Sequence, residues 1–498
     1  MKKFLIILAL SAVTASFSFG QTARTAPTPQ AAVKASAKIP YISRVLPNGL
    51  EVIVYPDSGV PLVTVEMAVR NGSFTEPPEL NGLSHLYEHM FFKTNKAVGI
   101  FRCDYAKTMG RMDYFIGANC GDQLKLKSQI GDTSYINDLD QSGYIRNGTT
   151  QEEYVNYYFS ATSPNLETLL RAMRDAMLFP SFDDREFEQE IQVVLGELDR
   201  QQSEPGYYLD RTMMDKLFYK YPSRKSPGGT RETVASATTD KMRLIQSRYY
   251  VPNNAALLVT GDADPERVFA LAEKLFGVWK RGEDPFIKFP LVEHPPLAKS
   301  EGIFVTQDVE NVIVQIGWHG PSIGKDNAST YAADVFSFIV GQPDSRFQRE
   351  MIDSGLAVSA DVHYYTQRNV GPIRITMVTT PEKAKAAIAK LHSEIAKFNT
   401  PGYFTDDELA NAKTLLESRD LYSREKLSEY SHTLGFWWSS TGTEYYRGYY
   451  DNLRAIKRPD ISKYLSTYIL GKPHVGVAMM SAAAKEASKL TEEDLIGK

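Results

Sequence analysis

The segment His85-Leu86-Tyr87-Glu88-His89 places two imidazoles and one carboxylate at the spacing H-x-x-E-H. On a helix, positions i, i+3 and i+4 share one face, so His85, Glu88 and His89 would converge on one point. Two imidazoles one turn apart can bind Zn²⁺ at about 2.0–2.1 Å each, and the carboxylate between them can activate a metal-bound water. The spacing predicts a hydrolytic zinc site; two structural histidines on a helix are the alternative.

Composition and charge are those of an ordinary globular protein. The 498 residues are too many for one hydrophobic core, so we expect two or more domains. Hydrophobic residues make up 43% of the chain and charged residues 23%. The formal net charge of −4 gives no indication of a nucleic acid or of an anionic membrane surface as a partner.

The N-terminus predicts export. Lysines at positions 2 and 3 precede an apolar stretch, and Ser18-Phe19-Gly20 offers small residues at a signal-peptidase cleavage site. We expect a signal peptide over 1–20, a flexible lead-in over 21–40, and a periplasmic or secreted protein; an uncleaved anchor is the alternative. No later segment reaches the roughly 18–20 apolar residues of a membrane span, so stable membrane insertion is not expected.

The two cysteines, Cys103 and Cys120, are the only ones in the chain. In an exported protein they could form one disulfide, which for a loop of this length is worth about 3 kcal/mol. No histidine or second cysteine stands beside either of them, which argues against a second metal site. Two free buried thiols are the alternative.

Alternating and apolar segments predict an α+β fold. The helix that bears His85 is expected to begin near residues 81–84, after two strands. Residues from about 95 to 142 have no clean period, and we interpret them as an insertion that carries both cysteines. The other elements expected in this half are strands at 50–55, 62–70, 144–146, 154–160 and 255–260 and helices at 165–179, 184–200 and 265–276.

Residues 281–299 contain four prolines and little periodicity, which predicts a linker between domains at 41–280 and 300–498. Ala332, Asp334 and Phe336 stand in the second domain where the first has its histidines, so only one domain is expected to bind metal. The order of elements recurs after the linker, which indicates a distant duplication: a strand at 311–318, a helix at 329–340, strands within 357–380, a helix at 381–398 and a helix-to-strand passage at 461–479.

A zinc site with a bound water needs a third protein ligand besides two histidines. The acidic helix expected at 184–200 offers several carboxylates, of which Glu190 and Glu197 lie two turns apart on one face. A solvated acidic face is the usual alternative for such a run of charges. The other carboxylates there are Glu186 and Glu188.

Residues 71–93, centred on the two histidines, resemble the signature of the pitrilysin, insulin-degrading enzyme and mitochondrial processing peptidase family of zinc metallopeptidases. The run 187–197, F-x-x-E-x-x-V-V-x-x-E, resembles that family's second element, and 249–262 resembles the close of its N-terminal domain. The resemblance implies two homologous α/β domains, each an antiparallel sheet flanked by helices, joined by a linker as half of a clamshell around a chamber.

The resemblance also implies roles for single residues. One Zn²⁺ would be held by His85, His89 and Glu197, and Glu190 would support the ligands from behind. Glu88 would be the general base for the metal-bound water, whose pKa falls from 15.7 towards about 7. Asn147 matches an edge-strand asparagine that lies along the bound peptide, and a simple turn asparagine is the alternative.

Active members of this family usually also carry an arginine and a tyrosine, seven positions apart, around a Gly-Leu-Ala segment. Here that segment is at 355–357, with Met351 at the arginine position and Val358 at the tyrosine position. Neither side chain can donate a hydrogen bond. Some family members divide the work between two chains, so we expect this chain to be the metal-bearing subunit, with a homologous subunit that supplies the Arg/Tyr pair.

Two functions from different classes follow. The first is an exported zinc endopeptidase or oligopeptidase that hydrolyses peptides or unfolded segments. The alternative is a non-catalytic scaffold or assembly subunit that keeps the peptidase fold. Glu88 argues against the alternative, because a scaffold has no need for a general base.

Overall fold

The computed structural model describes residues 40–498. The predicted signal peptide, and the lead-in as far as residue 39, lie outside the described residues. Among the described residues, 40–498, no helix has the length and apolar character needed to cross a membrane. They contain two β-sheets, one in each predicted domain.

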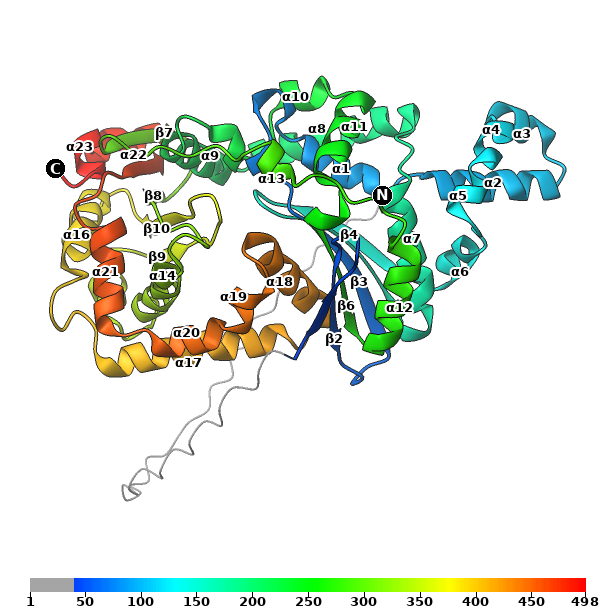
Figure 1. Ribbon diagram of the computed structural model, residues 1–498. Helices are drawn as coiled ribbons and strands as arrows, with labels where there is room; N and C mark the ends of the chain where they lie inside the picture. The colour runs from blue at the N-terminus through cyan, green and yellow to red at the C-terminus, as the bar shows by residue number, and fades with distance from the viewer. Residues whose placement is uncertain (1–39) are drawn as a thin grey trace, which may run out of the picture. The chain divides into compact units, whose positions relative to one another are not determined.

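The first sheet has six strands in the order β1-β2-β6-β3-β5-β4 (Figure 1). β2 and β6 run parallel, and all other neighbours are antiparallel. β4 is an edge strand, so one side of its backbone is free of sheet pairing. The strands are β1 Ile42–Val45, β2 Glu51–Pro56, β3 Leu62–Val69, β4 Ile145–Thr150, β5 Val155–Thr162 and β6 Ala255–Gly261.

The second sheet repeats the arrangement of the first without β1. Its order is β7-β11-β8-β10-β9, and β7 and β11 form its only parallel pair. The two parallel pairs depart from the expected antiparallel sheets, because the last strand of each domain returns beside an early one, β6 beside β2 and β11 beside β7. The strands are β7 Glu301–Thr306, β8 Val312–His319, β9 Ser359–Tyr364, β10 Pro372–Thr379 and β11 Val475–Met480.

Helices cover both faces of the first sheet. Alternation along β3 turns Val63 and Val65 towards the face covered by α1 (Leu83–Phe91), α7 (Leu166–Leu178) and α12 (Pro265–Phe276). Glu66 and Ala68 point to the opposite face, where α18 (Leu427–Ser440) packs on β3 and β6. A helix from the second half of the chain therefore completes the first sheet.

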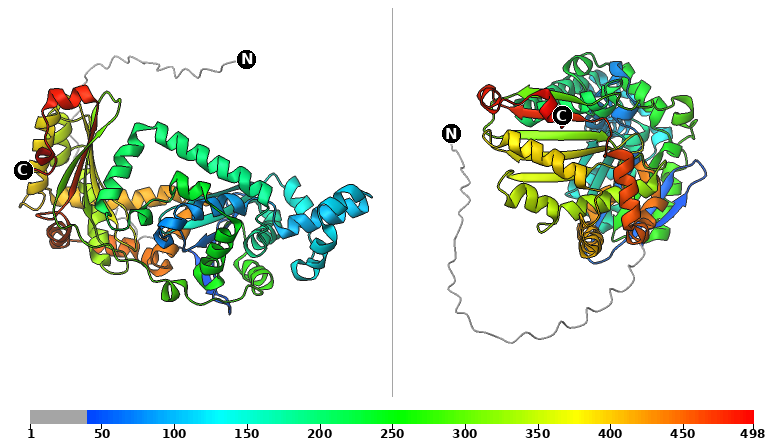
Figure 2. Two further views of the ribbon diagram at one scale, coloured as in Figure 1. Left: turned by 90° about the horizontal axis from the view of Figure 1, so that it is seen from above. Right: turned by 90° about the vertical axis from the view of Figure 1, so that its left-hand side faces the viewer.

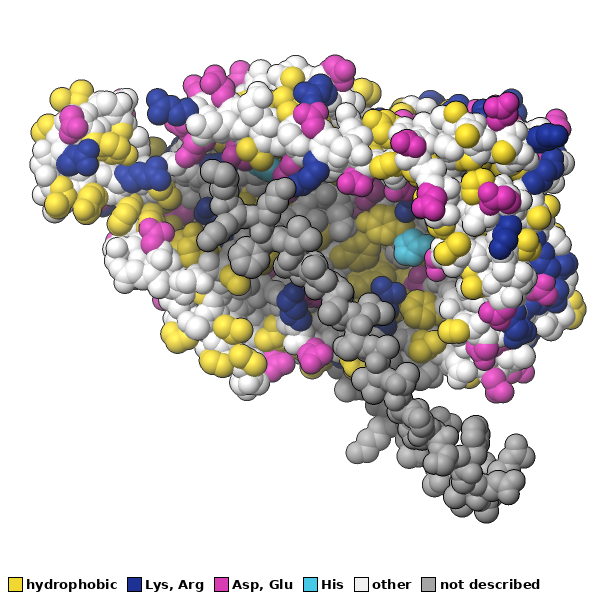
Figure 3. Space-filling model, turned by 180° about the vertical axis from the view of Figure 1, so that it is seen from behind, with side chains coloured by type: hydrophobic (Ala, Val, Ile, Leu, Met, Phe, Trp, Pro, Cys, Tyr) yellow, Lys and Arg dark blue, Asp and Glu magenta, His cyan; other side chains and the backbone are white. Residues whose placement is uncertain are grey.

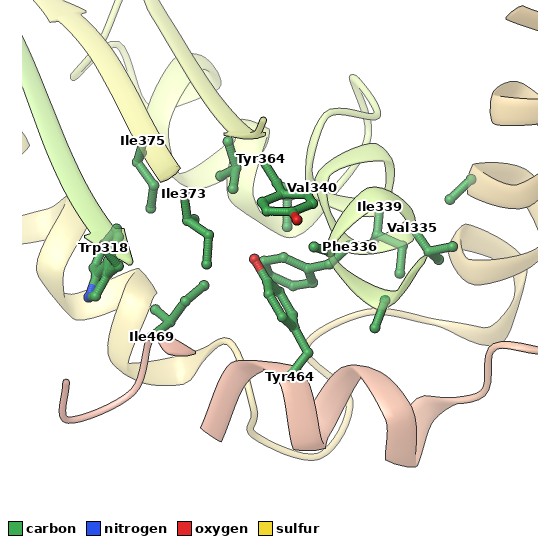
Figure 4. Close-up of a cluster of buried hydrophobic side chains, with 14 of the residues drawn as sticks. Trp318, Val335, Phe336, Ile339, Val340, Tyr364, Ile373, Ile375, Tyr464 and Ile469 are labelled. Atoms are coloured by element: carbon green, nitrogen blue, oxygen red, sulfur yellow. The ribbon is translucent and has the colours of Figure 1, made fainter. Parts of the chain in front are cut away.

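The second sheet is completed in the same way by a helix of the first half. α9 (Pro205–Leu217) packs Leu209, Met213 and Leu217 against β11. The other face packs on α14 (Asn327–Val340) and α21 (Arg458–Tyr468), where Figure 4 shows Trp318, Phe336, Tyr364, Ile373 and Tyr464 meeting. This exchange of helices buries apolar surface between the halves, so the described residues form one compact unit.

Two buried charges of the first half hold the loop between β9 and β10. Lys225 Nζ donates to the carbonyls of Asn369 at 2.6 Å and Val370 at 2.9 Å. Glu153 accepts from the backbone N–H groups of Arg368 at 2.6 Å and Asn369 at 2.7 Å. Burial lowers the pKa of Lys225 to about 8, although the charge of Glu153 opposes the shift. The first half thus satisfies both donors and acceptors of this loop.

Residues 95–142, expected to be an irregular insertion, are mostly helical. Ala97, Ile100 and Cys103 are buried at a spacing of three, a helical period carried by too few residues to stand out in the sequence. The segment α2–α5 projects away from the first sheet in Figures 1 and 2. Its helices are α2 Lys96–Thr108, α3 Met112–Gly117, α4 Cys120–Lys125 and α5 Lys127–Ile130, followed by α6 Tyr135–Gln141.

Cys103 and Cys120 form a disulfide between α2 and α4. Both side chains are fully buried beneath the exposed connection that they close. The remaining helices are α8 Asp184–Ser203, α10 Arg231–Ala235, α11 Thr239–Tyr249, α13 Pro285–Lys288, α15 Arg346–Gln348, α16 Ala384–Lys397, α17 Asp406–Ser423, α19 Thr443–Arg447, α20 Tyr449–Ala455, α22 Ala482–Ser488 and α23 Glu492–Leu495.

Candidate metal centre

Helix α1 begins against a buried carboxylate. Gly82, just before the helix, has φ +89°, and a Cβ there would lie 2.8 Å from the carbonyl oxygen of Gly228. Glu76 accepts from the N–H groups of Gly82 at 2.8 Å and Ser84 at 2.6 Å. These bonds satisfy free N–H groups at the positive end of the helix and so fix its first turn. Sequence analysis missed Glu76, because a loop of several residues separates it from the helix that it caps.

The amphipathic pattern of α1 turns the chemical groups away from the core. Leu83 and Leu86 are fully buried in the first domain. The side chains of His85, Glu88 and His89 are 19%, 11% and 15% exposed. All three mostly buried side chains therefore face one cleft, as the spacing predicted.

Helix α8 lies beside α1 (Figure 1) and supplies the facing carboxylates. Asp183 caps its N-terminus by accepting from the N–H of Glu186 at 3.1 Å. Val194 and Leu198 bury one side of the helix in the core of the first domain. Glu190 and Glu197 lie on the side that faces the two histidines.

Glu197 stands at the same distance from both imidazoles. Its Oε2 lies 3.6 Å from His85 Nε2 and 3.6 Å from His89 Nε2. Two ligands bound at about 2.0–2.1 Å with a tetrahedral angle between them stand about 3.4 Å apart. The two distances from Glu197 are therefore close to those between ligands of a tetrahedral zinc.

Glu88 also lies near the histidines, and its donor atom and theirs are within 4.8 Å of one another. Its Oε2 is 4.0 Å from His85 Nε2, farther than Glu197 is. Burial raises the pKa of Glu88 to about 7, although the charge of His89 and a 3.4 Å bond from Thr150 oppose the shift. Of the two carboxylates, Glu197 therefore lies nearer to His85 Nε2.

Strand β4 comes so close to Glu88 that it requires glycine at position 148. A Cβ on Gly148 would lie 2.7 Å from Glu88 Oε1 and 2.8 Å from its Cγ. Real side chains do not approach this closely, so the carboxylate would have to move. Sequence analysis named the neighbouring Asn147 and missed this glycine, because strand and helix meet only in the folded protein.

Glu190 holds one imidazole from behind. Its Oε2 lies 3.1 Å from His89 Nδ1, and its other oxygen pairs with the ammonium of Lys93. A carboxylate can only accept, so Nδ1 is the nitrogen that donates to Glu190, which leaves Nε2 to face the cleft. Burial lowers the pKa of His85 to about 4, with a further contribution from His89, so this imidazole is neutral at pH 7. Both histidines are thus suited to bind a cation.

The cleft has a volume of about 410 Å³ and is open to the edge strand. Asn147 lies on β4 and contributes to its wall, so the structure brings it together with the metal-site residues. The lining residues are His85, Glu88, His89, Phe92, Lys93, Arg146, Asn147, Gly148, Glu190 and Glu197.

The two positions expected for the Arg/Tyr pair lie in the second half. Met351 is fully buried within the core of that half, and Val358 is 65% exposed. Neither offers a hydrogen-bond donor in its side chain. The folded chain therefore does not place donor side chains at these positions.

Comparison with known proteins gives consistent matches along the chain. Residues 52–102 and 126–227 match the family model of insulinase, peptidase family M16, and residues 236–416 match that of the peptidase M16 inactive domain. An uncharacterised zinc protease of Rickettsia felis is 25% identical over 391 residues, which cover 78% of this chain and 85% of that protein. The uncharacterised zinc protease YmxG of Bacillus subtilis is 24% identical over 382 residues, 76% of this chain and 83% of that protein.

Among solved structures, a protease from Helicobacter pylori superimposes with a TM-score of 0.73 at 21% identity. The match covers 88% of this chain and 99% of that one, and at this identity it shows the shared fold alone. The matched family models cover the H-x-x-E-H helix and the strands of both sheets except β1 and β11. The chain belongs to the pitrilysin family of peptidases, family M16.

Proposed function

We propose that the protein is a zinc-dependent peptidase that binds one Zn²⁺ through His85, His89 and Glu197. The observation that carries the proposal is the pair of 3.6 Å distances from Glu197 Oε2 to the two imidazole nitrogens. Relatives named zinc proteases support the choice of metal. When bound, zinc supplies a Lewis acid that lowers the pKa of its water to about 7.

The chain's own residues then divide the remaining work. Glu88 lines the same cleft, where it would take a proton from the attacking water and pass it to the leaving amine. Its raised pKa of about 7 suits a group that both accepts and donates near neutral pH. Glu190 keeps His89 oriented through its bond to Nδ1.

The substrate is a peptide in extended form. β4 is the edge strand next to the metal cleft, and its free backbone groups can pair with an added strand. In this position Asn147 would lie along the bound peptide. Recognition through backbone groups favours unfolded segments over any one sequence.

We further propose that this chain is the metal-bearing subunit of a two-chain peptidase. Met351 and Val358 stand where the resemblance expects the arginine and tyrosine that hold substrate and oxyanion, and neither can donate a hydrogen bond. A homologous subunit would supply those donors. Losing one such donor costs about 10²–10³-fold in rate, so the isolated chain should hydrolyse peptides very slowly.

Export to the periplasm or the cell exterior is also a proposal. It is supported by the Lys2-Lys3 and apolar segment at the N-terminus and by the disulfide between Cys103 and Cys120. Disulfides of this kind persist in oxidising compartments. The N-terminal sequence of the protein recovered from the producing cells would show whether cleavage occurs before Gln21.

The test measures zinc content and peptide hydrolysis together. We expect one zinc per chain, slow hydrolysis by the chain alone, and at least 10²-fold faster hydrolysis after a homologous chain with the Arg/Tyr pair is added. Glu88→Gln should keep the zinc and lower hydrolysis by about 10²–10⁴-fold in both samples. Full activity of the chain alone would refute the two-chain proposal. Bound zinc without hydrolysis in any pairing would support the scaffold alternative.

A further inference from the structure

The connection closed by the disulfide carries a concentrated patch of exposed apolar side chains. Among the described residues twenty large hydrophobic side chains are exposed, and five of them lie within positions 105–116. We call these five the tip residues: Tyr105, Met109, Met112, Tyr114 and Ile116, with exposed fractions of 60%, 59%, 55%, 38% and 73%. Scattered exposed side chains are normal, but a cluster of this kind marks an interaction surface.

This part of the chain is an addition to the family fold. The M16 family model stops at residue 102 and resumes at 126, so it skips the whole tip and both cysteines. The segment projects from the body of the protein (Figures 1 and 2), and the disulfide between Cys103 and Cys120 closes the loop that contains all five tip residues. The tip is therefore not needed to build the metal cleft, and exposing it must serve another purpose.

The charge of this segment differs from that of the rest of the protein. Residues 95–131 contain six lysines and arginines and three aspartates, a net charge of +3, whereas the whole chain carries −4 and the remainder therefore −7. Lys107 and Arg111 are exposed between the apolar tip residues. Figure 3 shows hydrophobic and basic side chains next to one another on this projecting lobe, at the left of that view. The local charge thus favours an anionic partner, which the net charge of the chain did not indicate.

A small hollow at the base of the tip combines cations with aromatic rings. It has a volume of about 180 Å³ and is lined by Phe101, Arg102, Tyr105, Ala106, Arg111 and Tyr114. Guanidinium groups bind phosphate oxygens well, and the hollow is smaller than the roughly 300 Å³ or more of common ligand pockets. Its size and chemistry suit one phosphate head group at the edge of an apolar layer.

We propose that the tip docks the protein onto the surface of an anionic phospholipid bilayer. Aromatic and aliphatic side chains would enter the boundary between head groups and acyl chains, and Lys107 and Arg111 would remain among the phosphates. Apolar residues interleaved with basic ones are the usual composition of such peripheral anchors. Docking of this kind is reversible and involves no membrane-spanning segment.

The experiment measures co-sedimentation of the protein with vesicles in about 0.1 M salt, where the Debye length is about 10 Å. The protein is used as its host processes it, so that every variant has the same N-terminus. We expect binding to phosphatidylcholine vesicles that contain phosphatidylglycerol and much weaker binding to pure phosphatidylcholine. Replacement of two tip residues by Met109→Asp and Ile116→Asp should reduce the partition coefficient at least tenfold.

Two further variants test the contribution of the basic side chains and the specificity of the effect for the tip. Lys107→Glu with Arg111→Glu should reduce binding to the anionic vesicles by tenfold or more, since each basic side chain near the surface contributes about fivefold. Ile287→Asp is the matched control, because Ile287 is 83% exposed but lies outside the tip, and it should bind as the unaltered protein does. Circular dichroism and thermal unfolding show that each variant is folded.

The proposal is overturned if the unaltered protein does not bind anionic vesicles, which would instead leave a protein partner for the tip. It is also overturned if the tip variants bind as well as the Ile287→Asp control. Neither readout depends on peptide hydrolysis, so failure of this proposal and failure of the proposed peptidase function can be told apart.

Discussion

The Glu190→Gln substitution tests how the two glutamates of α8 divide their roles. Glu190 accepts from His89 Nδ1 at 3.1 Å and pairs with Lys93, and its side chain is only 10% exposed. Glutamine keeps an oxygen that can accept the same hydrogen bond but removes the charge. A hydrogen bond to a charged group is worth about 1.5–3 kcal/mol and a neutral one about 1 kcal/mol, so the substitution should cost about 1–1.5 kcal/mol.

This loss corresponds to about tenfold weaker zinc binding, since 1.4 kcal/mol is a factor of ten. It falls at the low end of the 10–100-fold effects typical of groups that orient metal ligands. Glu197→Gln should weaken zinc far more, because it removes a ligand. Glu188→Gln is the matched control, since Glu188 is exposed on the same helix two positions from Glu190.

The assay is competition for zinc against a chromophoric chelator, which needs neither a substrate nor a partner subunit. We expect the control to bind zinc with the same dissociation constant as the unaltered protein. The dissociation constant of Glu190→Gln should be about tenfold larger, and that of Glu197→Gln should be the largest. If Glu190→Gln binds as the control does, the positioning role is wrong. If Glu190→Gln and Glu197→Gln exchange places in this order, the ligand has been misassigned.

Two other perturbations test the surroundings of the site. Gly148→Ala should displace the Glu88 carboxylate and lower peptide hydrolysis about 10²-fold with zinc retained, as expected for a misplacement approaching 1 Å. Gly196→Ala is the control and should leave hydrolysis unchanged, because a Cβ there meets nothing within 4 Å. Equal activities of the two variants would refute the steric argument. Burial lowers the pKa of His432, but its 2.6 Å bond to buried Glu66 and the charge of that carboxylate raise the pKa by more. The pKa of His432 in the folded protein is therefore above its ordinary value of 6.5. The stability gained from this pair is therefore complete below pH 6.5 and is lost as the pH rises through the folded-state pKa. Urea unfolding at several pH values should show this decline in the unaltered protein and not in His432→Gln. The same decline in both proteins would place its origin elsewhere.

Local sequence patterns predicted much of the secondary structure. The apolar period of residues 265–276 predicted α12 to the residue, and the uninterrupted apolar run at 255–260 predicted β6 within one residue. α12 packs in the core of the first domain and β6 is buried on both faces, so the apolar composition of each segment indicates its burial. α9 and α18 were not predicted, because each packs on the sheet of the other half, and no local pattern shows which surface will bury a helix.

For the site, the sequence determined which groups could do chemistry. His85, Glu88 and His89 share one face of a single helix, so their spacing alone brings them together. The cysteines were known as a possible pair, and the structure joins them. Glu197 was predicted as a ligand from its resemblance to a family motif, since nothing in the neighbouring sequence distinguishes it from the other carboxylates of α8.

Only the tertiary structure decided how these groups are used. The distance of Glu197 from the imidazoles depends on how α8 packs beside α1, more than a hundred residues away in the chain. The requirement for glycine at position 148 and the cap that Glu76 places on α1 arise from contacts between separate elements. Such contacts are set by packing of whole surfaces, which is long-range and cooperative, whereas spacing along one helix is fixed by its 3.6-residue turn.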